Sequence, residues 1–533
     1  MVDSTRASGS DDSGSLGDLV LGIDAGTSAC KAVVWDLHGN VVTQGRASLS
    51  LLTPRPQWHE QLADDWWAAL VAAVNSALVG HRQLADRIVA LCIAPQRETF
   101  VPVDTAGRPL RNAIVWMDER SRELLPGIAA GYGGERIHQT TGKPLSGNLA
   151  PGKIRWLQRY EPKVFARTHK FLDVAAFLNH MLTGLYRTGW GCVDPMGLFD
   201  MRENAWSESL LGYLGISIDQ MPEVCPTGSV IGELTEPAAE ACGLQPGTAV
   251  VAGVGDGQSG GLGANITEPG KAYLSLGTSV VSGTTTEDYV VDRAFRTMTG
   301  GVPGTYSLET VLLGGTYTVD WLLDKLLGCD SAEARAAALD RYDAALDTVP
   351  LGAEGLMVVP YWNSAMNPYW DAGAGGITVG WRGNHTPEHL YRAVLEGIAY
   401  EQRLHTEGVE AALGRQVEAY VAMGGGAQSA RWCRIIADVT GRPLLRAVAP
   451  ESAASSAAAL GAGILAAFGS GLYTDVREAA SAMTRLDSVC FVPDVERHAR
   501  YDRLYNEVYC GLFPALQGRL DRLTELTELV MPA

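Results

Sequence analysis

The sequence predicts an α/β fold with two large domains that face each other across a cleft, and three observations support this. The chain has 533 residues, which is more than a single hydrophobic core usually organises. Apolar strand-like runs alternate with amphipathic helical runs, as in α/β domains. Glycine-rich turns follow apolar runs in both halves of the chain. We therefore expect a disordered N-terminal tail over residues 1–18, a first domain over 19–268 and a second domain over 269–533.

Composition excludes several classes of function. The net charge is −18, from 60 acidic against 42 basic residues, and no Lys/Arg cluster offsets it locally, so no nucleic-acid partner is expected. No run approaches the roughly 18 apolar residues of a membrane span, so no membrane partner is expected either. The nine cysteines are scattered without a Cys-x-x-Cys pair, which disfavours a zinc site and a disulfide framework. Residues 1–18 lack the basic start and apolar stretch of a secretory signal, which predicts a cytoplasmic protein.

Hydrophobic periodicity predicts the order of the elements. The first is a strand, a tight turn and a second strand over residues 20–36. The later elements are a helix over 64–78, a strand over 88–93, helical segments over much of 150–215, a buried strand over 249–256, a strand, turn and strand over 272–280, a helix over 386–405, a strand over 419–423, a helix over 429–440 and a small-residue helix over 453–468. The helix-rich stretch suggests a subdomain inserted into the first domain.

The first turn has the residues of a phosphate-binding hairpin. Gly26 permits close backbone approach, and the N–H and hydroxyl groups of Thr27 and Ser28 can face anionic oxygens. Asp24, at the end of the first strand, can hold hydrated Mg²⁺. An ordinary hairpin would have the same sequence features, so the meaning of this turn depends on its partners elsewhere in the chain.

A polar loop directly follows the strand over 88–93. Gln96, Arg97 and Glu98 place an amide, a guanidinium and a carboxylate in consecutive positions, and such groups suit neighbouring substrate hydroxyls. A solvated loop with a local ion pair is the alternative. Two tracts that join aromatic and polar residues, at 58–60 and 116–120, could complete such a site or simply belong to the core.

Asp256 is the candidate for catalysis, because it follows a buried apolar strand inside a glycine-rich turn. A carboxylate at that position points into a cleft. There it can accept the proton of a substrate hydroxyl as the oxygen attacks phosphorus. Capping of the next helix is the competing explanation.

The second domain carries two further glycine turns at strand ends. Gly277 and Thr278 repeat the Gly-Thr-Ser pattern of the first turn. The glycine triplet at 424–426 precedes Gln428 and opens a helix, and its lack of side chains would let a flat base or ribose lie against the backbone. The triplet lacks Rossmann spacing and the chain has no Gly-x-x-x-x-Gly-Lys-Ser/Thr, which disfavours the usual dinucleotide and P-loop sites.

Six tracts, taken in order, resemble the motif series of the FGGY carbohydrate kinases, and the resemblance covers nearly the whole chain after residue 18. They are Asp-Ala-Gly-Thr-Ser at 24–28, Gln-Arg-Glu-Thr at 96–99, Trp-Met-Asp-Glu-Arg at 116–120, Gly-Asp-Gly-Gln at 255–258, Leu-Gly-Thr-Ser at 276–279 and Met-Gly-Gly-Gly at 423–426. The resemblance implies an actin-like ATPase fold, in which two ribonuclease-H-like domains surround an ATP cleft. The tracts around Lys153 and Trp381 match the family imperfectly, so no role is taken from them.

Carried over by position, the resemblance implies roles for these residues. Asp24 would organise Mg²⁺, and Asp256 would be the general base. The residues that would contact ATP are Gly26, Thr27 and Ser28 from the first domain and Gly277, Thr278, Gly424, Gly425 and Gln428 from the second. The residues that would contact the substrate are Gln96, Arg97, Glu98, Asp256 and Gln258.

The substrate is predicted less sharply than the reaction. Overall similarity, including Trp66 and Trp67, favours the xylulokinase-like branch, whereas the loop at 96–99 resembles the Arg-Glu-Thr of glycerol and other polyol kinases. The Asp-Gly-Gln at 256–258, however, lacks the Asp-Gln-Gln run typical of glycerol kinase. We expect an ATP-dependent kinase of a small sugar or polyol, with a ketopentose such as xylulose first and glycerol, erythritol or a related polyol as the alternative.

Two other classes of function share the implied fold. A nucleotide-gated actin-like binding or assembly protein would not need a hydroxyl-recognition loop facing a base, and a kinase that had lost activity and acts as a sugar sensor would not keep every chemical position. The oligomeric state is left open, with a homodimer as the candidate assembly.

Overall fold

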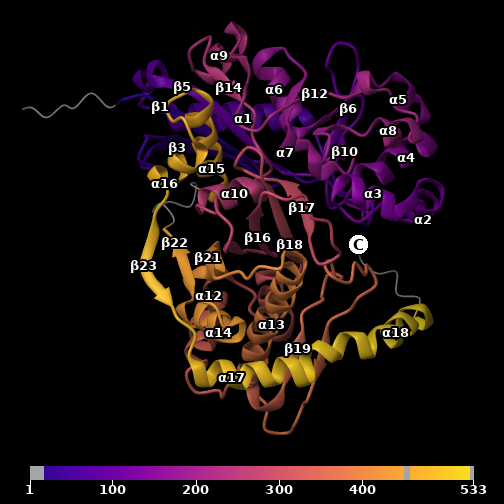
Figure 1. Ribbon diagram of the computed structural model, residues 1–533, viewed down its shortest axis with the longest axis vertical. Helices are drawn as coiled ribbons and strands as arrows, with labels where there is room; N and C mark the ends of the chain where they lie inside the picture. Colours follow the sequence, from indigo (N-terminus) through magenta and orange to yellow (C-terminus); the bar gives the residue numbers. More distant parts are fainter. Residues whose placement is uncertain (1–16, 449–455, 528–533) are drawn as a thin grey trace, which may run out of the picture.

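The computed structural model describes residues 17–448 and 456–527, which form two bodies that are each built on a large β-sheet (Figure 1). The predicted N-terminal tail lies outside the described residues except for Gly17 and Asp18. Within the described ranges, none of the helices combines the length and the apolar character that a membrane crossing requires.

The first body contains a six-stranded sheet. Its strands, in spatial order, are β13 (Val230–Glu233), β14 (Ala249–Val251), β5 (Ile88–Pro95), β1 (Leu19–Ala25), β2 (Ala29–Trp35) and β3 (Val41–Ser48). Strands β1, β2 and β3 form an antiparallel meander, while β5 runs parallel to β1 and β14 runs parallel to β5. The ends of β1 and β5 therefore meet at one edge, where the predicted polar loop begins.

The second body repeats this arrangement in a seven-stranded sheet. Its strands, in spatial order, are β17 (Arg296–Thr299), β18 (Tyr306–Leu312), β16 (Val280–Thr286), β15 (Lys271–Leu276), β21 (Ala419–Met423), β22 (Leu444–Ala447) and β23 (Leu486–Phe491). Here β15, β16 and β18 form the meander, and β21 and β22 add parallel strands. The repeated strand, turn and strand in the sequence thus corresponds to a repeated topology.

A third, four-stranded sheet joins distant segments of the first body. Its strands, in spatial order, are β4 (Glu60–Gln61), β7 (Ala113–Ile114), β6 (Phe100–Val103) and β8 (Lys170–Asp173). Beside it lie the helices of the predicted subdomain, among them α3 (Gly134–Thr141), α4 (Ala150–Tyr160) and α6 (Val174–Thr183). This sheet holds the tracts at 58–60 and 116–120 next to the predicted substrate loop.

Most of the predicted elements are confirmed, with differences at their ends. The helix predicted over 64–78 is α1 (Ala63–Leu78), and the one over 386–405 continues as α13 (Pro387–Leu413) until Gly414 adopts a left-handed conformation. The strand predicted over 249–256 ends at Val251, because glycines interrupt the apolar run after it. Its last predicted residue, Asp256, is instead the first residue of α10 (Asp256–Gly263). The small-residue helix is α15 (Ala457–Gly469); the first residues predicted for it, 453–455, lie outside the described part of the chain.

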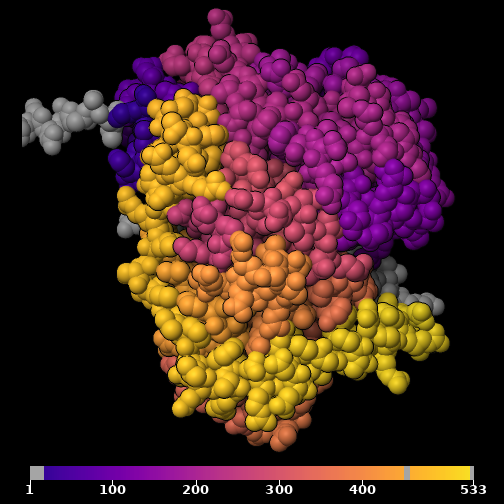
Figure 2. Space-filling model, viewed as in Figure 1, coloured from indigo at the N-terminus to yellow at the C-terminus, as the bar shows by residue number. Residues whose placement is uncertain are grey.

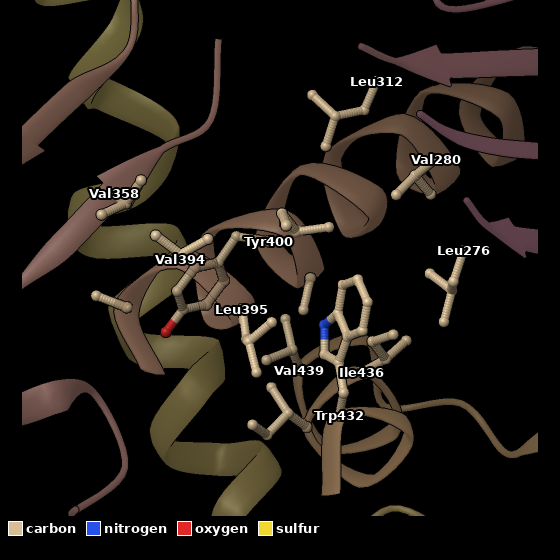
Figure 3. Packing of buried hydrophobic residues seen from close by; sticks show 14 of the residues in the cluster. Leu276, Val280, Leu312, Val358, Val394, Leu395, Tyr400, Trp432, Ile436 and Val439 are labelled. Carbon is tan, nitrogen blue, oxygen red and sulfur yellow. The ribbon is translucent and has the colours of Figure 1, made fainter. Parts of the chain in front are cut away.

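The core of the second body is built around α13 and α14 (Ala430–Thr440). Figure 3 shows Tyr400 of α13 and Trp432 of α14 among aliphatic side chains of both helices and of the neighbouring strands, and both aromatic residues are buried. Burial of such large side chains is a main source of stability for each body.

The strand β1 is covered on both faces, by helices from different parts of the sequence. Alternate residues Leu19, Leu21 and Ile23 belong to the cluster under α1 and α6, while Val20 belongs to the cluster that includes α15. Helix α15 comes from residues 457–469, yet it packs against β1 and β5 of the first body. Figures 1 and 2 show this yellow segment over the first body before the chain runs down along the orange second body. The domain boundary near residue 268 stays a prediction. Helix α15 comes after that boundary in the sequence, yet it packs with the first body.

Glycines allow the close approach of α15. A Cβ atom at Gly22 would lie 1.9 Å from the carbonyl oxygen of Ala459, and one at Gly461 would lie 1.9 Å from that of Ser259 in α10. Both neighbours are backbone atoms, which cannot rotate away as a flexible side chain can. The helix therefore contacts β1 and α10 almost backbone to backbone.

The substitution Gly461→Ala is expected to destabilise the protein by about 3 kcal/mol, because the added methyl group overpacks the contact between α15 and α10. Gly518→Ala is the matched control: it is also helical, in α18 (Cys510–Thr527), but its Cβ would meet open space. This control should be neutral or up to about 1 kcal/mol stabilising. Calorimetric melting midpoints compare the two, and equal losses would contradict the packing argument.

Candidate active site

A cavity of about 1040 Å³ lies between the two bodies and is lined from both of them. Its volume suits a ligand of nucleotide size. The polar side chains in its lining are Lys31, Arg97, Tyr273, Asp256, Ser275, Gln428, Arg446, Ser456 and Asp487. Gly424 and Gly425 line it with bare backbone.

Asp24 lies beside this cavity at the end of β1 and is held by two side chains of the lining. The antiparallel register places it opposite Lys31, whose ammonium donates to Asp24 Oδ2 at 3.0 Å. The Ser456 hydroxyl, just before α15, donates to the same oxygen at 2.9 Å. No donor within the described part of the chain reaches Oδ1, which leaves one carboxylate oxygen available.

The first glycine turn is fastened to the predicted substrate loop by side-chain hydrogen bonds. The Thr27 hydroxyl donates to Gln96 Oε1 at 3.2 Å and accepts from Trp116 Nε1 at 3.0 Å. The amide nitrogen of Gln96 donates to Gln61 Oε1 at 2.8 Å, so Gln96 is buried with both ends of its amide engaged. This network fixes the turn and the loop relative to each other.

Asp256 opens α10 and faces the cavity with a side chain that is 41% exposed. Its Oδ1 atom accepts from the N–H of Gly257 at 2.8 Å and pairs with Nε of Arg97 at 2.9 Å. No hydrogen bond to Oδ2 comes from the residues described. The alternative of a capping residue is not observed, because Gly255 occupies the cap position and no side chain caps this helix.

The environment of Asp256 changes its acidity. Desolvation by the surrounding protein raises the pKa of this carboxyl to about 6; Arg97 opposes the rise, and Asp24 and Glu309 add to it. A carboxylate with a pKa near 6 is ionised at neutral pH yet more basic than an ordinary aspartate. That combination suits a general base.

Arg97 and Glu98, next to each other in the loop, pair with the second body. Arg97 Nη1 donates to Glu309 of β18 at 2.7 Å, and Arg296 of β17 donates to Glu98 Oε1 at 2.6 Å. Arg97 also donates to Gln258 Oε1 at 3.3 Å. The loop is therefore not the solvated loop with a local ion pair that was the alternative.

The two glycine turns of the second body touch each other near the cavity. Gly424 has φ of 86°, and a Cβ there would lie 2.9 Å from the carbonyl oxygen of Leu276, which precedes Gly277. The backbone N–H of Thr316, at the start of α11 (Thr316–Trp321), donates to the carbonyl of Gly277 at 2.8 Å. Glycine at 424 is thus required both by its conformation and by the close approach.

Comparison with known proteins identifies the family. The model of the N-terminal domain of the FGGY family of carbohydrate kinases matches residues 19–263, and the model of the C-terminal domain matches residues 272–470. This chain belongs to the FGGY family of carbohydrate kinases. It is accordingly an ATP-using phosphotransferase with an alcohol group as acceptor, and the predicted family and reaction class are confirmed.

Individual relatives agree with the family assignment. The chain is 30% identical over 501 residues to a xylulose kinase of Staphylococcus epidermidis, covering 93% of this chain and 96% of the relative. It is 26% identical to a gluconokinase of Bacillus licheniformis, covering 93% and 94%. The crystal structure of xylulose kinase from Rhodospirillum rubrum superposes with a TM-score of 0.84 at 27% identity, covering 94% of this chain and all of that one. The predicted actin-like ATPase fold is thereby confirmed.

The structure of this FGGY kinase brings part of the predicted site to the cavity. Of the predicted residues, Arg97, Asp256, Gly424, Gly425 and Gln428 line it. The other predicted residues do not line it; they are Asp24, Gly26, Thr27, Ser28, Gln96, Glu98, Gln258, Gly277 and Thr278. The contacts of these residues with ATP, Mg²⁺ and substrate stay predictions.

Several residues of the site were not predicted. Lys31 and Ser456 hold Asp24, and Arg296 and Glu309 hold the predicted substrate loop. Only Lys31 had a signal in the sequence, because a tight turn after Asp24 places it opposite in the hairpin. The other three lie in unremarkable sequence far along the chain.

Lys153 connects two segments of the predicted site. Its side chain is completely buried in α4, and its ammonium donates to the backbone carbonyls of Glu98, Val115, Trp116 and Asn148 at 2.7–3.3 Å. Burial lowers the pKa of this lysine to about 8, against the opposing charges of Asp118 and Glu98. One cation therefore fastens the predicted substrate loop to the tract at 116–120.

Lys153→Met should destabilise the protein by about 3 kcal/mol, because it leaves backbone carbonyls without their buried donor. Lys163→Met is the control, since Lys163 is exposed on α5 (Pro162–Arg167) and should change stability by no more than about 0.5 kcal/mol. Urea unfolding at neutral pH measures both. Similar small losses in the two variants would show that Lys153 does not fasten the loop.

Proposed function

We propose that this FGGY kinase transfers the γ-phosphate of ATP to a hydroxyl of a small sugar, with a ketopentose such as xylulose as the preferred acceptor. The observation that carries the proposal is Asp256, which combines an available oxygen, a pKa raised to about 6 and a place on the cavity between the two bodies. The similarity to xylulose kinases over more than nine-tenths of the chain supports the choice of acceptor.

In the proposed reaction, Asp256 takes the proton of the acceptor hydroxyl. The acceptor oxygen forms a bond to the γ-phosphorus, the bond from that phosphorus to the β,γ-bridging oxygen breaks, and ADP leaves with the electron pair. Asp256 Oδ2 is the oxygen that receives the proton, since Oδ1 is occupied by Arg97 and Gly257. Closure of the two bodies over the substrates would exclude water and limit hydrolysis of ATP.

Asp24 has a donor set that fits Mg²⁺. Mg²⁺ in kinases is usually bound by one or two carboxylates together with phosphates and water, rather than by a cage of protein side chains. One oxygen of Asp24 is held by Lys31 and Ser456, and the other is available. Across residues 17–448 and 456–527, no group of three or more His, Cys, Asp or Glu side chains offers a cage. Bound Mg²⁺ would neutralise phosphate charge.

The nucleotide is proposed to lie along the glycine turns. Gly424 and Gly425 present bare backbone to the cavity, and Gln428 adds an exposed amide. Backbone of this kind admits a flat base or ribose. The turn at Gly277 and Thr278 touches Gly424 and would meet the phosphates, opposite Thr27 and Ser28 of the first turn.

A polyol such as glycerol or erythritol is the second candidate acceptor. The Arg-Glu-Thr sequence of the loop favours it, whereas the engagement of Arg97 and Glu98 by Glu309 and Arg296 leaves these side chains fewer free donors and acceptors for a substrate. A nucleotide-gated assembly protein is no longer a candidate, because the chain belongs to a family of carbohydrate kinases. A cytoplasmic location and a homodimer remain parts of the proposal.

Asp256→Asn should lower kcat by at least about 1,000-fold while ATP affinity, measured by calorimetric titration, stays within about threefold. In the wild type, kcat/KM for the acceptor should rise with pH through about 6 and then level off, because the carboxylate must be ionised to take the proton. Asp64→Asn, at an exposed acid in the first turn of α1, is the control. A folded Asp256→Asn variant with normal turnover would exclude this base.

A coupled ADP-release assay across ketopentoses, tetritols, pentitols and glycerol tests the acceptor. D-xylulose should give the highest kcat/KM, because the chain most resembles xylulose kinases along its length. A tetritol or glycerol in first place would favour the polyol alternative. If no acceptor stimulates ATP turnover above the acceptor-free background, the proposed function fails.

A further inference from the structure

A series of ion pairs links Asp256 of the first body to Glu309 and Arg296 of the second body and returns to Glu98 of the first body. Arg97 pairs with Asp256 at 2.9 Å and with Glu309 at 2.7 Å. Glu309 also accepts from Arg296, which pairs with Glu98 at 2.6 Å. Arg97 and Glu98 follow β5 of the first body, whereas Arg296 and Glu309 lie on β17 and β18 of the second.

We propose that Glu309 is a positioning residue for phosphoryl transfer, which orients Arg97 beside Asp256 and at the same time compensates much of the positive charge of Arg97 that Asp256 faces. The inference rests on the proposed role of Asp256. It adds a fully buried residue from the opposite body, distant in sequence, that pairs with Arg97.

The geometry of Glu309 leaves it little freedom. Its side chain has no exposed surface, and its two oxygens accept from Arg97, Arg296 and the hydroxyl of Tyr273, the last at 3.1 Å. Burial alone would raise the pKa of Glu309, but the two guanidinium groups outweigh burial and hold the pKa at about 2. A buried carboxylate with two cationic partners fixes both of them in position.

The glycines that flank Asp256 leave room for this arrangement. A Cβ atom at Gly255 would lie 2.4 Å from Cδ of Arg97. One at Gly257 would lie 2.6 Å from Oε2 of Glu309 and 3.0 Å from Nη2 of Arg97. The Arg97 side chain therefore passes over the turn that carries Asp256, where any side chain larger than hydrogen would displace it.

The charged groups that face Asp256 change its pKa in opposite directions. Arg97 lowers the pKa of Asp256, while Asp24, Glu309 and Glu98 raise it. Without Glu309, Asp256 would lose a negative neighbour and would face a less compensated Arg97, and both changes favour the ionised form. Without Arg97, the ionised form would lose its partner.

The test is the acid limb of the pH profile of kcat/KM at saturating Mg-ATP, with D-xylulose as acceptor, or erythritol if D-xylulose is not phosphorylated. Glu309→Gln should move the midpoint of this limb down by about one pH unit, and Arg97→Gln should move it up by about one. Both should lose about 10- to 100-fold in kcat, because the base is less well placed. If Glu309→Gln does not fold, Arg296→Gln replaces it and should move the midpoint up.

Glu396→Gln is the matched control. Glu396 is also buried, accepting from Arg392 at 2.7 Å and from the hydroxyl of Tyr501 at 2.7 Å, but it lies on α13 in the core of the second body. It should lower stability without moving the midpoint. A folded Glu309 or Arg97 variant with the wild-type midpoint, or shifts of the wrong sign, would overturn the inference. Absence of the acid limb in the wild type would instead contradict the proposed role of Asp256 as the base, on which this inference rests.

Discussion

The close packing of α15 against β1 and α10 is the constraint on which the site depends. The end of β1 carries Asp24 and the start of α10 carries Asp256, and these elements are far apart in the sequence. Both are drawn to one helix, because glycines on each side allow backbone contact and because Ser259 of α10 donates to the carbonyl of Ala458. Larger residues along α15 would separate the two carboxylates.

Buried ion pairs also determine the conformation of the loop at 96–99. Removing ions from water costs several kcal/mol each, and this cost is offset only where every ion keeps its partners. Arg97, Arg296, Glu98 and Glu309 meet that condition together, as does Lys153 among its carbonyls. The arrangement cannot relax gradually, since moving one member leaves another charge buried and unpaired. These ion pairs therefore hold the loop in one conformation, whereas apolar packing alone would allow several conformations.

Local patterns allowed much of the fold and part of the site to be predicted. The strand, turn and strand that occur twice in the sequence lie at corresponding places in the two sheets, and Asp256, which was expected to face a cleft because it follows an apolar strand within a glycine-rich turn, lines the cavity. Arg97 was also found, although its partners were not. Local spacing carries such information, since it fixes which residues end a strand.

The remaining parts could not be predicted, because they depend on contacts between distant segments. Arg296 and Glu309 are single charges within ordinary strands, and only the assembled bodies bring them to the loop. Gln96 is of a residue type that often binds ligands, yet its amide is buried, because it donates to Gln61 of the two-residue strand β4. Likewise, α15 follows most of the second body in the sequence, but its small residues let it pack against the first body.

The bare backbone at Gly257 has a consequence for how this kinase changes through evolution. A side chain at that position would need space now filled by Arg97 and Glu309, which are encoded 212 positions apart. Single replacements at any of the three sites would meet a clash or an unpaired charge, so these sites are expected to vary together among descendants. Exchange of gene segments between relatives that differ at these positions would break the set.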